Sequence, residues 1–192
     1  MTTSLRFATA TAAQTRELGQ ALAAVVRPGD VVSLSGDLGA GKTCLVQGLA
    51  RGLDVSLPVT SPTFMLQKTY PGRELLVHLD VYRLDRLRDV VDLGDEAMAP
   101  DVVTVIEWGD TIQSLLPPDR LELELRHRDG IGQGLDDDVT PAALGDEPAP
   151  VDADGELVDL PRTVVATLHG RWQERHDDLA ASARPLLDPE SP

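Results

Sequence analysis

Gly36 Asp37 Leu38 Gly39 Ala40 Gly41 Lys42 Thr43 is the stretch of the chain that decides its fold. It matches the GxxxxGKT phosphate-binding loop at every fixed position. The glycines let successive backbone N–H groups turn toward phosphates, the lysine reaches the outer phosphates, and the threonine hydroxyl can hold Mg²⁺. The stretch therefore predicts a nucleoside triphosphate site.

The residues on either side of this loop are those that such a loop requires. A short apolar run at residues 31–34 precedes it, and Leu45, Leu49 and Leu53 recur every four residues after it. This pattern predicts a strand, the loop and a helix in that order, with the helix dipole directed at the phosphates. The chain has 17 basic residues but only two lysines, Lys42 and Lys68, so lysine is used selectively in the loop.

Length and composition predict one α/β domain. With 192 residues, 42% of them hydrophobic, the chain can bury one sizeable core. We expect a P-loop NTPase-like fold with a mostly parallel central sheet, antiparallel additions and flanking helices. The expected parts are an ATPase core at 1–128, an insertion at 129–161, a strand and helix at 162–182 that complete the core, and a tail at 183–192.

Composition also excludes several classes of protein. The sequence contains no run of about 18 uncharged apolar residues, which a membrane-spanning helix would need, and its N-terminus lacks the pattern of a signal peptide. We therefore expect a cytoplasmic protein that does not enter a membrane. A single cysteine, Cys44, excludes a disulfide framework and a multi-cysteine metal site. The net charge of −15 disfavours direct binding of nucleic acid.

Much of the negative charge lies in one segment. Residues 129–161 contain ten acidic and no basic residues, among many glycines, prolines and alanines. This composition predicts a solvated, disordered insertion, and an acidic docking segment is the functional alternative.

Two predicted strands end in carboxylates. Residues 75–80 are an apolar run that ends at Asp80, and residues 102–107 end at Glu107. A carboxylate at the end of a strand beside a phosphate-binding loop can hold Mg²⁺ or its water ligands. Either residue fits that role, or one binds the metal while the other orients or deprotonates the attacking water. His78 lies inside the first run, where we expect a hydrogen-bonded core imidazole and not a catalytic group.

The remaining segments give simpler expectations. Residues 11–14 have the form of a capping box, followed by a helical apolar face that continues to Pro28. The polar loop at 60–64 is either a nucleotide switch or an ordinary turn, and the charged segment 85–100 is either a second switch or surface. Strict alternation at 121–125 predicts a strand with one wet face, in an antiparallel part of the sheet, and 162–168 predicts a final strand followed by a helix.

Four motifs in one order resemble the TsaE family of bacterial ATPases, also called YjeE. They are GDLGAGKT at 36–43, SPTF at 61–64, HLDVYRL at 78–84 and IEW at 106–108. The resemblance covers roughly residues 8–128 and resumes near Arg162. It implies a small α/β domain that acts with the TsaB and TsaD proteins. That assembly attaches a threonylcarbamoyl group to the adenosine beside the anticodon of tRNAs.

The resemblance also implies roles for individual residues. ATP and Mg²⁺ would be the cofactors, and the ATPase would be weak alone and activated by TsaB and TsaD. Lys42, Asp80 and Glu107 would be catalytic, and Thr43, Asp80 and Glu107 would form the metal site. The implied nucleotide-binding residues are Asp37, Leu38, Gly39, Ala40, Gly41, Lys42, Thr43, Cys44, Thr63, Trp108 and Arg162.

Two features depart from the family pattern: Cys44, and the acidic insertion, which interrupts the region where relatives have a short turn before a strand that carries an arginine near the nucleotide. Cys44 stands where the family has a hydroxyl residue, and a thiol is a weaker donor to the inner phosphate. Arg162 is the position that matches the family's arginine near the nucleotide, and an ordinary surface arginine is the alternative.

Three other functions compete with the TsaE interpretation. A P-loop small-molecule kinase would commonly carry a lid with arginines, and the acidic insertion has none. A regulatory GTPase would need an NKxD segment, which the sequence lacks. A pure interaction protein with a dead site would not need the intact Lys42, Thr43 and two carboxylates.

Overall fold

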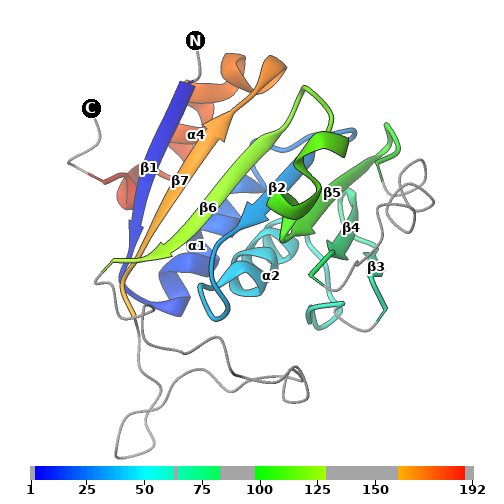
Figure 1. The fold of residues 1–192 in the computed structure, drawn as a ribbon, viewed down its shortest axis with the longest axis horizontal. Coiled ribbons are helices and arrows are strands. Elements are labelled where there is room, and N and C mark those ends of the chain that lie inside the picture. The colour runs from blue at the N-terminus through cyan, green and yellow to red at the C-terminus, as the bar shows by residue number, and fades with distance from the viewer. Residues whose placement is uncertain (1–2, 63–64, 83–97, 129–159, 189–192) are drawn as a thin grey trace, which may run out of the picture.

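The computed structural model describes residues 3–62, 65–82, 98–128 and 160–188. These residues form a seven-stranded sheet in the order β1-β7-β6-β2-β5-β4-β3, which Figure 1 shows running from one side of the molecule to the other. The strands are β1 (Thr3–Thr9), β2 (Val31–Ser35), β3 (Gln67–Tyr70), β4 (Leu75–Asp80), β5 (Val102–Glu107), β6 (Leu121–His127) and β7 (Arg162–Leu168).

The middle of the sheet is parallel and its outer parts are antiparallel. β2 pairs in parallel with β5 and β6, and β4 pairs in parallel with β5. β1 and β6 each pair antiparallel with β7, and β3 pairs antiparallel with β4. The predicted fold class is confirmed. The prediction for β6 was only half right, because this strand is antiparallel to β7 but parallel to the loop-bearing strand β2.

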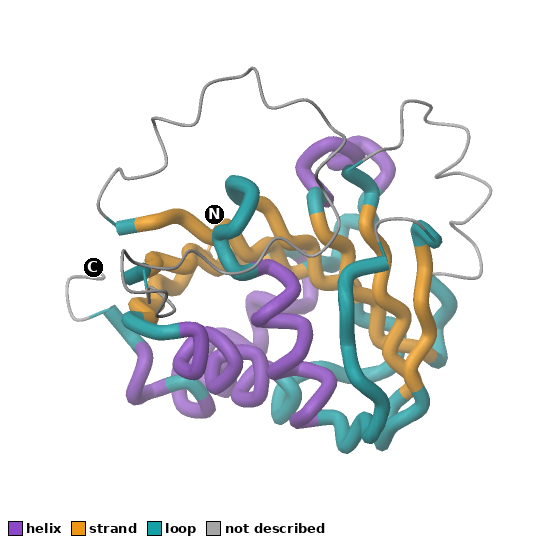
Figure 2. The backbone as a smooth tube through the Cα atoms, turned by 90° about the horizontal axis from the view of Figure 1, so that it is seen from below, coloured by secondary structure: helices purple, strands orange, loops and turns teal. Residues whose placement is uncertain are grey.

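Most of the helices cover one face of the sheet, and a shorter helical segment lies on the other face (Figure 2). The main core lies between the sheet and α1 (Ala12–Leu22), α2 (Lys42–Gly52) and α4 (His176–Ser182). A smaller core on the opposite face packs Val77, Leu79 and Ile106 against the 3₁₀ helix η1 (Gly109–Leu115). Two further 3₁₀ helices, η3 (Gly170–Arg175) and η4 (Arg184–Leu186), flank α4 in the chain.

The predicted N-cap of the first helix forms at Thr11, in a variant of the capping box in which Gln14 reaches back to Ala10, one residue before the cap. The Thr11 hydroxyl accepts a hydrogen bond from Gln14 N at 3.1 Å, and the Gln14 side chain accepts one from Ala10 N at 2.6 Å. The helix ends at Leu22, earlier than the Pro28 boundary expected from the sequence. Residues 23–26 form a tighter turn that still buries Val25 in the core. Periodicity alone does not distinguish such a turn from a continued helix.

Helices α1 and α2 pack backbone against backbone. A Cβ on Gly19 would collide with the carbonyl oxygen of Leu45, and a Cβ on Gly48 would collide with the carbonyl oxygen of Arg16. Only glycine permits this approach. The close contact holds the loop-bearing helix α2 tightly against α1.

The C-terminal segment is tied to the turn that precedes β2. Arg175 donates two hydrogen bonds to Asp30, at 2.5 and 3.0 Å, and both side chains are buried. The Arg175 guanidinium also lies over the Trp172 ring, 4.6 Å from its centre. Asp30 directly precedes β2, so this ion pair connects the end of the chain to the strand that leads into the phosphate-binding loop.

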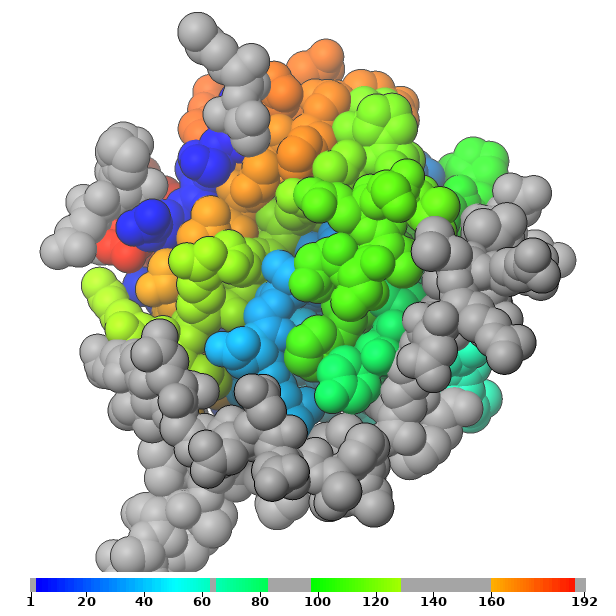
Figure 3. Space-filling view, in the orientation of Figure 1, coloured from blue at the N-terminus to red at the C-terminus, as the bar shows by residue number. Residues whose placement is uncertain are grey.

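The outer strands were not all expected. The sequence interpretation missed β1 and β3, which occupy the two edges of the sheet. On the face opposite the helices, β1, β7 and β6 lie at the surface, blue, orange and yellow-green in Figure 3. In the described ranges, no helix is long and apolar enough to cross a membrane. The predicted insertion, apart from residues 160–161, lies outside the described residues, as do residues 85–97 of the second candidate switch region and 189–192 of the tail.

Candidate nucleotide site

The phosphate-binding loop connects β2 to α2 at the carboxyl end of the central strands. Gly36 has φ +126° and leads from the strand into the loop, where a Cβ would collide with the carbonyl oxygen of Leu125 on β6. Gly41, with φ +100°, is the residue that caps the N-terminus of α2. The sequence therefore uses glycine where the chain must turn against β6 and where the helix must open toward a ligand.

Lys42 is the first residue of α2 and its side chain folds back into the loop. Its Nζ donates hydrogen bonds to the carbonyl oxygens of Gly36, at 2.7 Å, and Asp37, at 2.8 Å. Burial lowers the pKa of the ammonium group from 10.5 to about 8, although the nearby carboxylates of Glu107 and Asp80 act in the opposite direction. Within the described ranges, Lys42 is thus a poorly hydrated cation whose hydrogen bonds go to neutral carbonyls, and an anion would satisfy it better.

Thr43 and Glu107 are hydrogen-bonded to each other. The Thr43 hydroxyl donates to Glu107 Oε1, at 2.8 Å, with Oε2 at 3.1 Å. Glu107 is only 3% exposed, and His78 Nε2 lies 2.8 Å from its Oε1. The predicted metal-binding hydroxyl and one predicted carboxylate therefore meet directly at the start of α2.

Asp80 lies at the end of the neighbouring strand and has different partners. Its Oδ2 accepts a hydrogen bond from the Ser61 hydroxyl at 2.6 Å, and its Oδ1 accepts one from Tyr82 N at 3.1 Å. Asp80 and Glu107 are paired in register across β4 and β5, so both carboxylates reach the same edge of the sheet. Asp80 is joined to the polar loop before β3, whereas Glu107 is joined to the phosphate-binding loop.

Trp108 follows Glu107 in a left-handed conformation, with φ +62° and ψ +32°. A large side chain is uncommon in this region of φ/ψ space. Its ring lies 4.7 Å from the Tyr82 ring, centre to centre, and 3.5 Å from Lys42 Nζ. The backbone conformation thus turns an aromatic ring toward the loop lysine.

Arg162 is not a surface arginine, so that alternative is wrong. It is 7% exposed, and its Nε lies 3.1 Å from where a Cβ on Gly41 would be. One guanidinium nitrogen donates to Leu160 O at 2.8 Å, while the buried Nε has no hydrogen-bond partner within the described part of the chain. A buried cationic donor beside the loop fits an anionic ligand.

His127 is a candidate that the sequence interpretation missed. It is paired with Arg162 across β6 and β7, and its buried Nδ1 likewise has no partner among the residues described. Burial and the neighbouring Arg162 charge lower the pKa of the imidazole, against an opposing effect of Asp37. His127 falls two residues after the alternating run 121–125, and no pattern in the sequence marks it as part of a site.

The other predicted nucleotide-binding residues differ in burial and in contacts. The Cys44 thiol donates to the carbonyl oxygen of Ala12 at 3.2 Å, at the start of α1. Ala40 is fully buried, whereas the Leu38 side chain is 51% exposed at the loop. Thr63 lies outside the described residues.

Together these groups fit a triphosphate with Mg²⁺. The glycines of the loop leave the start of α2 open, and Lys42 and Arg162 supply buried positive charge beside it. The Thr43 hydroxyl is hydrogen-bonded to the Glu107 carboxylate. In the segments described, no group of three His, Cys, Asp or Glu residues could hold a metal ion. Mg²⁺ is commonly held by one or two carboxylates, with water and phosphate oxygens completing its octahedron.

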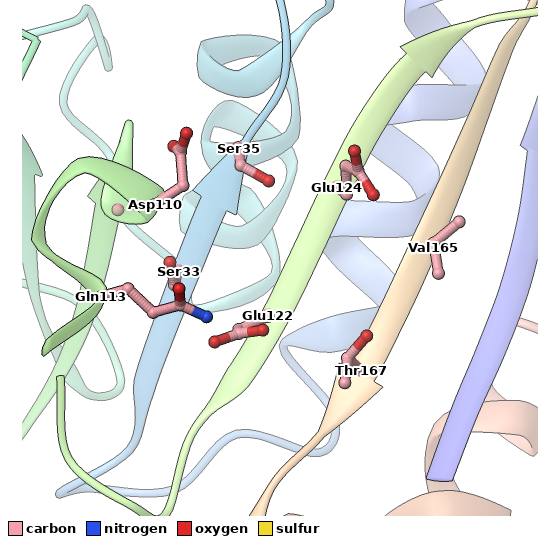
Figure 4. Close-up of a pocket in the computed structure, with 9 residues that line it drawn as sticks. Ser33, Ser35, Asp110, Gln113, Glu122, Glu124, Val165 and Thr167 are labelled. Atoms are coloured by element: carbon pink, nitrogen blue, oxygen red, sulfur yellow. The ribbon is translucent and has the colours of Figure 1, made fainter. Parts of the chain in front are cut away.

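A separate pocket lies on the opposite face of the sheet, between η1 and strands β2, β6 and β7 (Figure 4). Its volume is about 170 Å³, and Glu122, Glu124 and Asp110 line it. Burial opposes the ionisation of Glu122, but a hydrogen bond from Arg120 and the nearby His169 ring, whose Nε2 lies 3.1 Å from Oε2, outweigh burial and lower the pKa of Glu122. A pocket lined by carboxylates repels phosphate, so we assign the nucleotide to the loop and not to this pocket.

Comparisons with known proteins agree on one family. A family model described as "Threonylcarbamoyl adenosine biosynthesis protein TsaE" matches residues 9–133. The TsaE protein of Streptomyces coelicolor is 43% identical over 143 residues, which cover 71% of this chain and 95% of that protein. The TsaE protein of Treponema pallidum is 43% identical over 123 residues, which cover 64% and 91%. Both are named tRNA threonylcarbamoyladenosine biosynthesis proteins.

A solved structure has a similar fold. The crystal structure of Bacillus subtilis YdiB matches with a TM-score of 0.63 and 27% sequence identity, over 96% of this chain and 97% of that chain.

Proposed function

The chain belongs to the TsaE family of threonylcarbamoyl adenosine biosynthesis proteins, and from that premise we propose that it is the Mg²⁺-dependent ATPase of tRNA threonylcarbamoyladenosine formation. In this proposal it binds and hydrolyses ATP as a component of a machinery that contains TsaB and TsaD. Such a role implies action in the cytoplasm.

The hydrogen bond from Thr43 to Glu107 carries this proposal. It joins the hydroxyl of the phosphate-binding loop to a buried carboxylate at 2.8 Å. In P-loop NTPases a Ser or Thr of the loop and an acidic residue at a strand end together hold Mg²⁺. The pair therefore supports a site built for a metal nucleotide and not merely for phosphate.

Each residue of the proposed site has its own role in binding the metal nucleotide. Lys42 exchanges the carbonyl oxygens of Gly36 and Asp37 for the outer phosphates, which bind an ammonium more strongly than a neutral carbonyl does. Thr43 and Glu107 hold the metal or its water ligands. Arg162, whose Nε is buried beside Gly41, adds positive charge near the phosphates. Mg²⁺, when bound, would supply the charge that neutralises the phosphates during their transfer to water.

Asp80 is suited to the second carboxylate role. Its partners are Ser61 and the backbone of Tyr82 rather than Thr43, so its environment differs from that of Glu107. A division between a metal-holding carboxylate and one that orients or deprotonates water requires such a difference. Because Ser61 belongs to the polar loop before β3, movement of that loop would also move a partner of Asp80.

The proposed partners explain how an acidic protein serves tRNA. The net charge of −15 opposes the phosphate contacts on which nucleic-acid binding depends, so TsaB and TsaD would contact the tRNA. We further propose that the ATPase is weak alone and that these partners activate it by ordering or completing the site. Partner-activated GTPases work in this way.

The test is phosphate release from ATP by the purified chain, alone and with TsaB and TsaD. We expect little release alone and a large rise when both partners are present. Lys42→Ala should abolish the rise and weaken ATP binding. Asp80→Ala and Glu107→Ala should retain most of the nucleotide affinity but lose turnover. Near-normal hydrolysis in both carboxylate variants would contradict the assigned roles.

The same experiment separates this proposal from a P-loop small-molecule kinase. A kinase would transfer phosphate to a metabolite without any dependence on TsaD. Fast turnover by the chain alone, indifferent to both partners, would therefore reject the proposed pathway while leaving the nucleotide site intact.

A further inference from the structure

His78 lies at the centre of the carboxylate site without facing solvent. It belongs to β4, its side chain is 0% exposed, and its Nε2 lies 2.8 Å from Glu107 Oε1. The sequence interpretation took His78 for an ordinary hydrogen-bonded core imidazole. Its partner, however, is one of the two carboxylates proposed for catalysis.

The Glu107 carboxylate is held from two sides. Oε1 lies 2.8 Å from the Thr43 hydroxyl on α2 and 2.8 Å from His78 Nε2 on β4. The parallel pairing of β4 with β5 fixes the relative height of the two strands, with His78 opposite Val105 and Asp80 opposite Glu107. Two rigid elements therefore define where the carboxylate sits.

The hydrogen bonds indicate which nitrogen of His78 carries the proton. A carboxylate only accepts hydrogen bonds, so Nε2 must donate. Nδ1 is also buried, and no residue in the described ranges is hydrogen-bonded to it. Among the described residues, therefore, only Nε2 has a hydrogen-bond partner, and the Nε2–H group is the end of the side chain that acts on Glu107.

We propose that His78 is the positioning residue of the site, which fixes the orientation of the Glu107 carboxylate for Mg²⁺-dependent hydrolysis. The inference rests on the proposed function. His78 acts through Glu107 and touches neither nucleotide nor metal itself. Outer partners of this kind orient the groups that bind a metal, and their removal typically lowers metal affinity or activity 10- to 100-fold.

Three substitutions distinguish positioning from packing. The side-chain amide nitrogen of His78→Gln can reach about the place of Nε2, that of His78→Asn corresponds to Nδ1 and falls short, and His78→Leu has no donor. With TsaB and TsaD present, we expect kcat for ATP to fall on the order of 10- to 100-fold in the Leu and Asn variants. The Gln variant should stay within about threefold of the unsubstituted chain, because it keeps the donor.

A second readout does not depend on turnover. ADP affinity without Mg²⁺ should change little in all three variants, since the loop and Lys42 are untouched. The gain in ADP affinity on adding Mg²⁺ should shrink in the Leu and Asn variants and persist in the Gln variant. Val77→Ala is the matched control: this neighbour on β4 is buried in the smaller core, so its truncation lowers stability without removing a donor.

An NMR measurement on the unsubstituted chain covers the case in which the variants do not fold. The His78 ring should be protonated at Nε2, with its proton far downfield, and that proton should shift when Glu107→Gln removes the carboxylate charge. Protonation at Nδ1 instead would overturn the inference.

The other outcomes are also decisive. If His78→Leu matches the unsubstituted chain, or if Val77→Ala reproduces its loss of kcat at equal stability, His78 only packs. If the unsubstituted chain itself shows no partner-stimulated hydrolysis, the proposed function fails, and the NMR and Mg²⁺-dependent ADP measurements still decide the role of His78.

Discussion

The ammonium nitrogen of Lys42 lies 3.5 Å from the centre of the Trp108 ring. A cation in contact with an aromatic face is attracted by the ring quadrupole. The same nitrogen donates hydrogen bonds to two carbonyl oxygens of the phosphate-binding loop. We therefore expect phosphates that bind Lys42 to draw its ammonium group away from the ring, and this displacement would have a spectroscopic consequence.

We predict that adding ATP changes the fluorescence of Trp108. The chain has two tryptophans, and the other, Trp172, is buried against Arg175. A fluorescence titration should show the change in the unsubstituted chain and in Trp172→Phe, and it should be absent in Trp108→Phe. A signal that persists in Trp108→Phe would place the responsive group elsewhere.

We predict that ATP affinity falls as the pH rises above about 8. Burial lowers the pKa of free Lys42 to about 8, and bound phosphates raise it again by favouring the charged form. Below this pKa the lysine is already protonated, so affinity should not depend on its titration. Above it, binding must take up a proton, and affinity should decrease toward about tenfold per pH unit.

Calorimetry at about pH 8.5 in two buffers of different ionisation enthalpy would measure this proton uptake. Lys42→Arg provides the control, because a guanidinium stays charged throughout this range. It should bind ATP more weakly but lose the decline with pH. The same decline in Lys42→Arg would show that another group is responsible.

We predict that the Thr43 hydroxyl, and not the size of the side chain, determines the response to Mg²⁺. Thr43→Ser keeps the donor to Glu107, whereas Thr43→Val has a similar shape and no hydroxyl. The Mg²⁺ concentration for half-maximal hydrolysis should change little in the Ser variant and rise about tenfold or more in the Val variant. Equal Mg²⁺ dependence in the two variants would argue that the hydroxyl does not serve the metal.

We predict that breaking the Asp30–Arg175 ion pair strongly destabilises the chain. Both side chains are buried, and removing one partner leaves the other charge uncompensated, at a cost of about 3–5 kcal/mol. Urea unfolding should show this loss for Arg175→Met. Asp30→Asn with Arg175→Met should be more stable than Arg175→Met alone, because the amide oxygen can still accept from Arg27 N and no charge remains.

A double variant as unstable as the sum of the two single variants would contradict this coupling. The phosphate-binding loop lies at the far end of β2 from Asp30, so ATP affinity measured well below the unfolding transition should be unchanged.

The sequence was most informative where local chemistry leaves few options. The glycines at 36 and 41, the lysine and the threonine of the loop are required by backbone conformation and charge, and the strands that end at Asp80 and Glu107 show continuous apolar patterns. The core strands β2, β4, β5 and β7 were therefore predicted correctly, as was α2.

The contacts between these elements could not be predicted in the same way. The pairing of β1 with β7 joins residues more than 150 positions apart, and the burial of Arg162 follows from that part of the sheet. The register between neighbouring strands brings His127 beside Arg162 and His78 close to Glu107, and the sequence does not reveal this register. Sequence periodicity shows which face a residue occupies but not what lies opposite it.

The glycine contact between α1 and α2 has a consequence for which parts of the site are able to move. Gly19 and Gly48 bring the two helix backbones into direct contact, so we expect α2 to shift or rotate little against α1. During ATP binding and hydrolysis we then expect side chains and loops of the site to move while α2 keeps its position. We therefore expect a partner protein to sense the nucleotide through groups next to α2 that are free to move: the Lys42 ammonium, the Trp108 ring and the loop that bears Ser61.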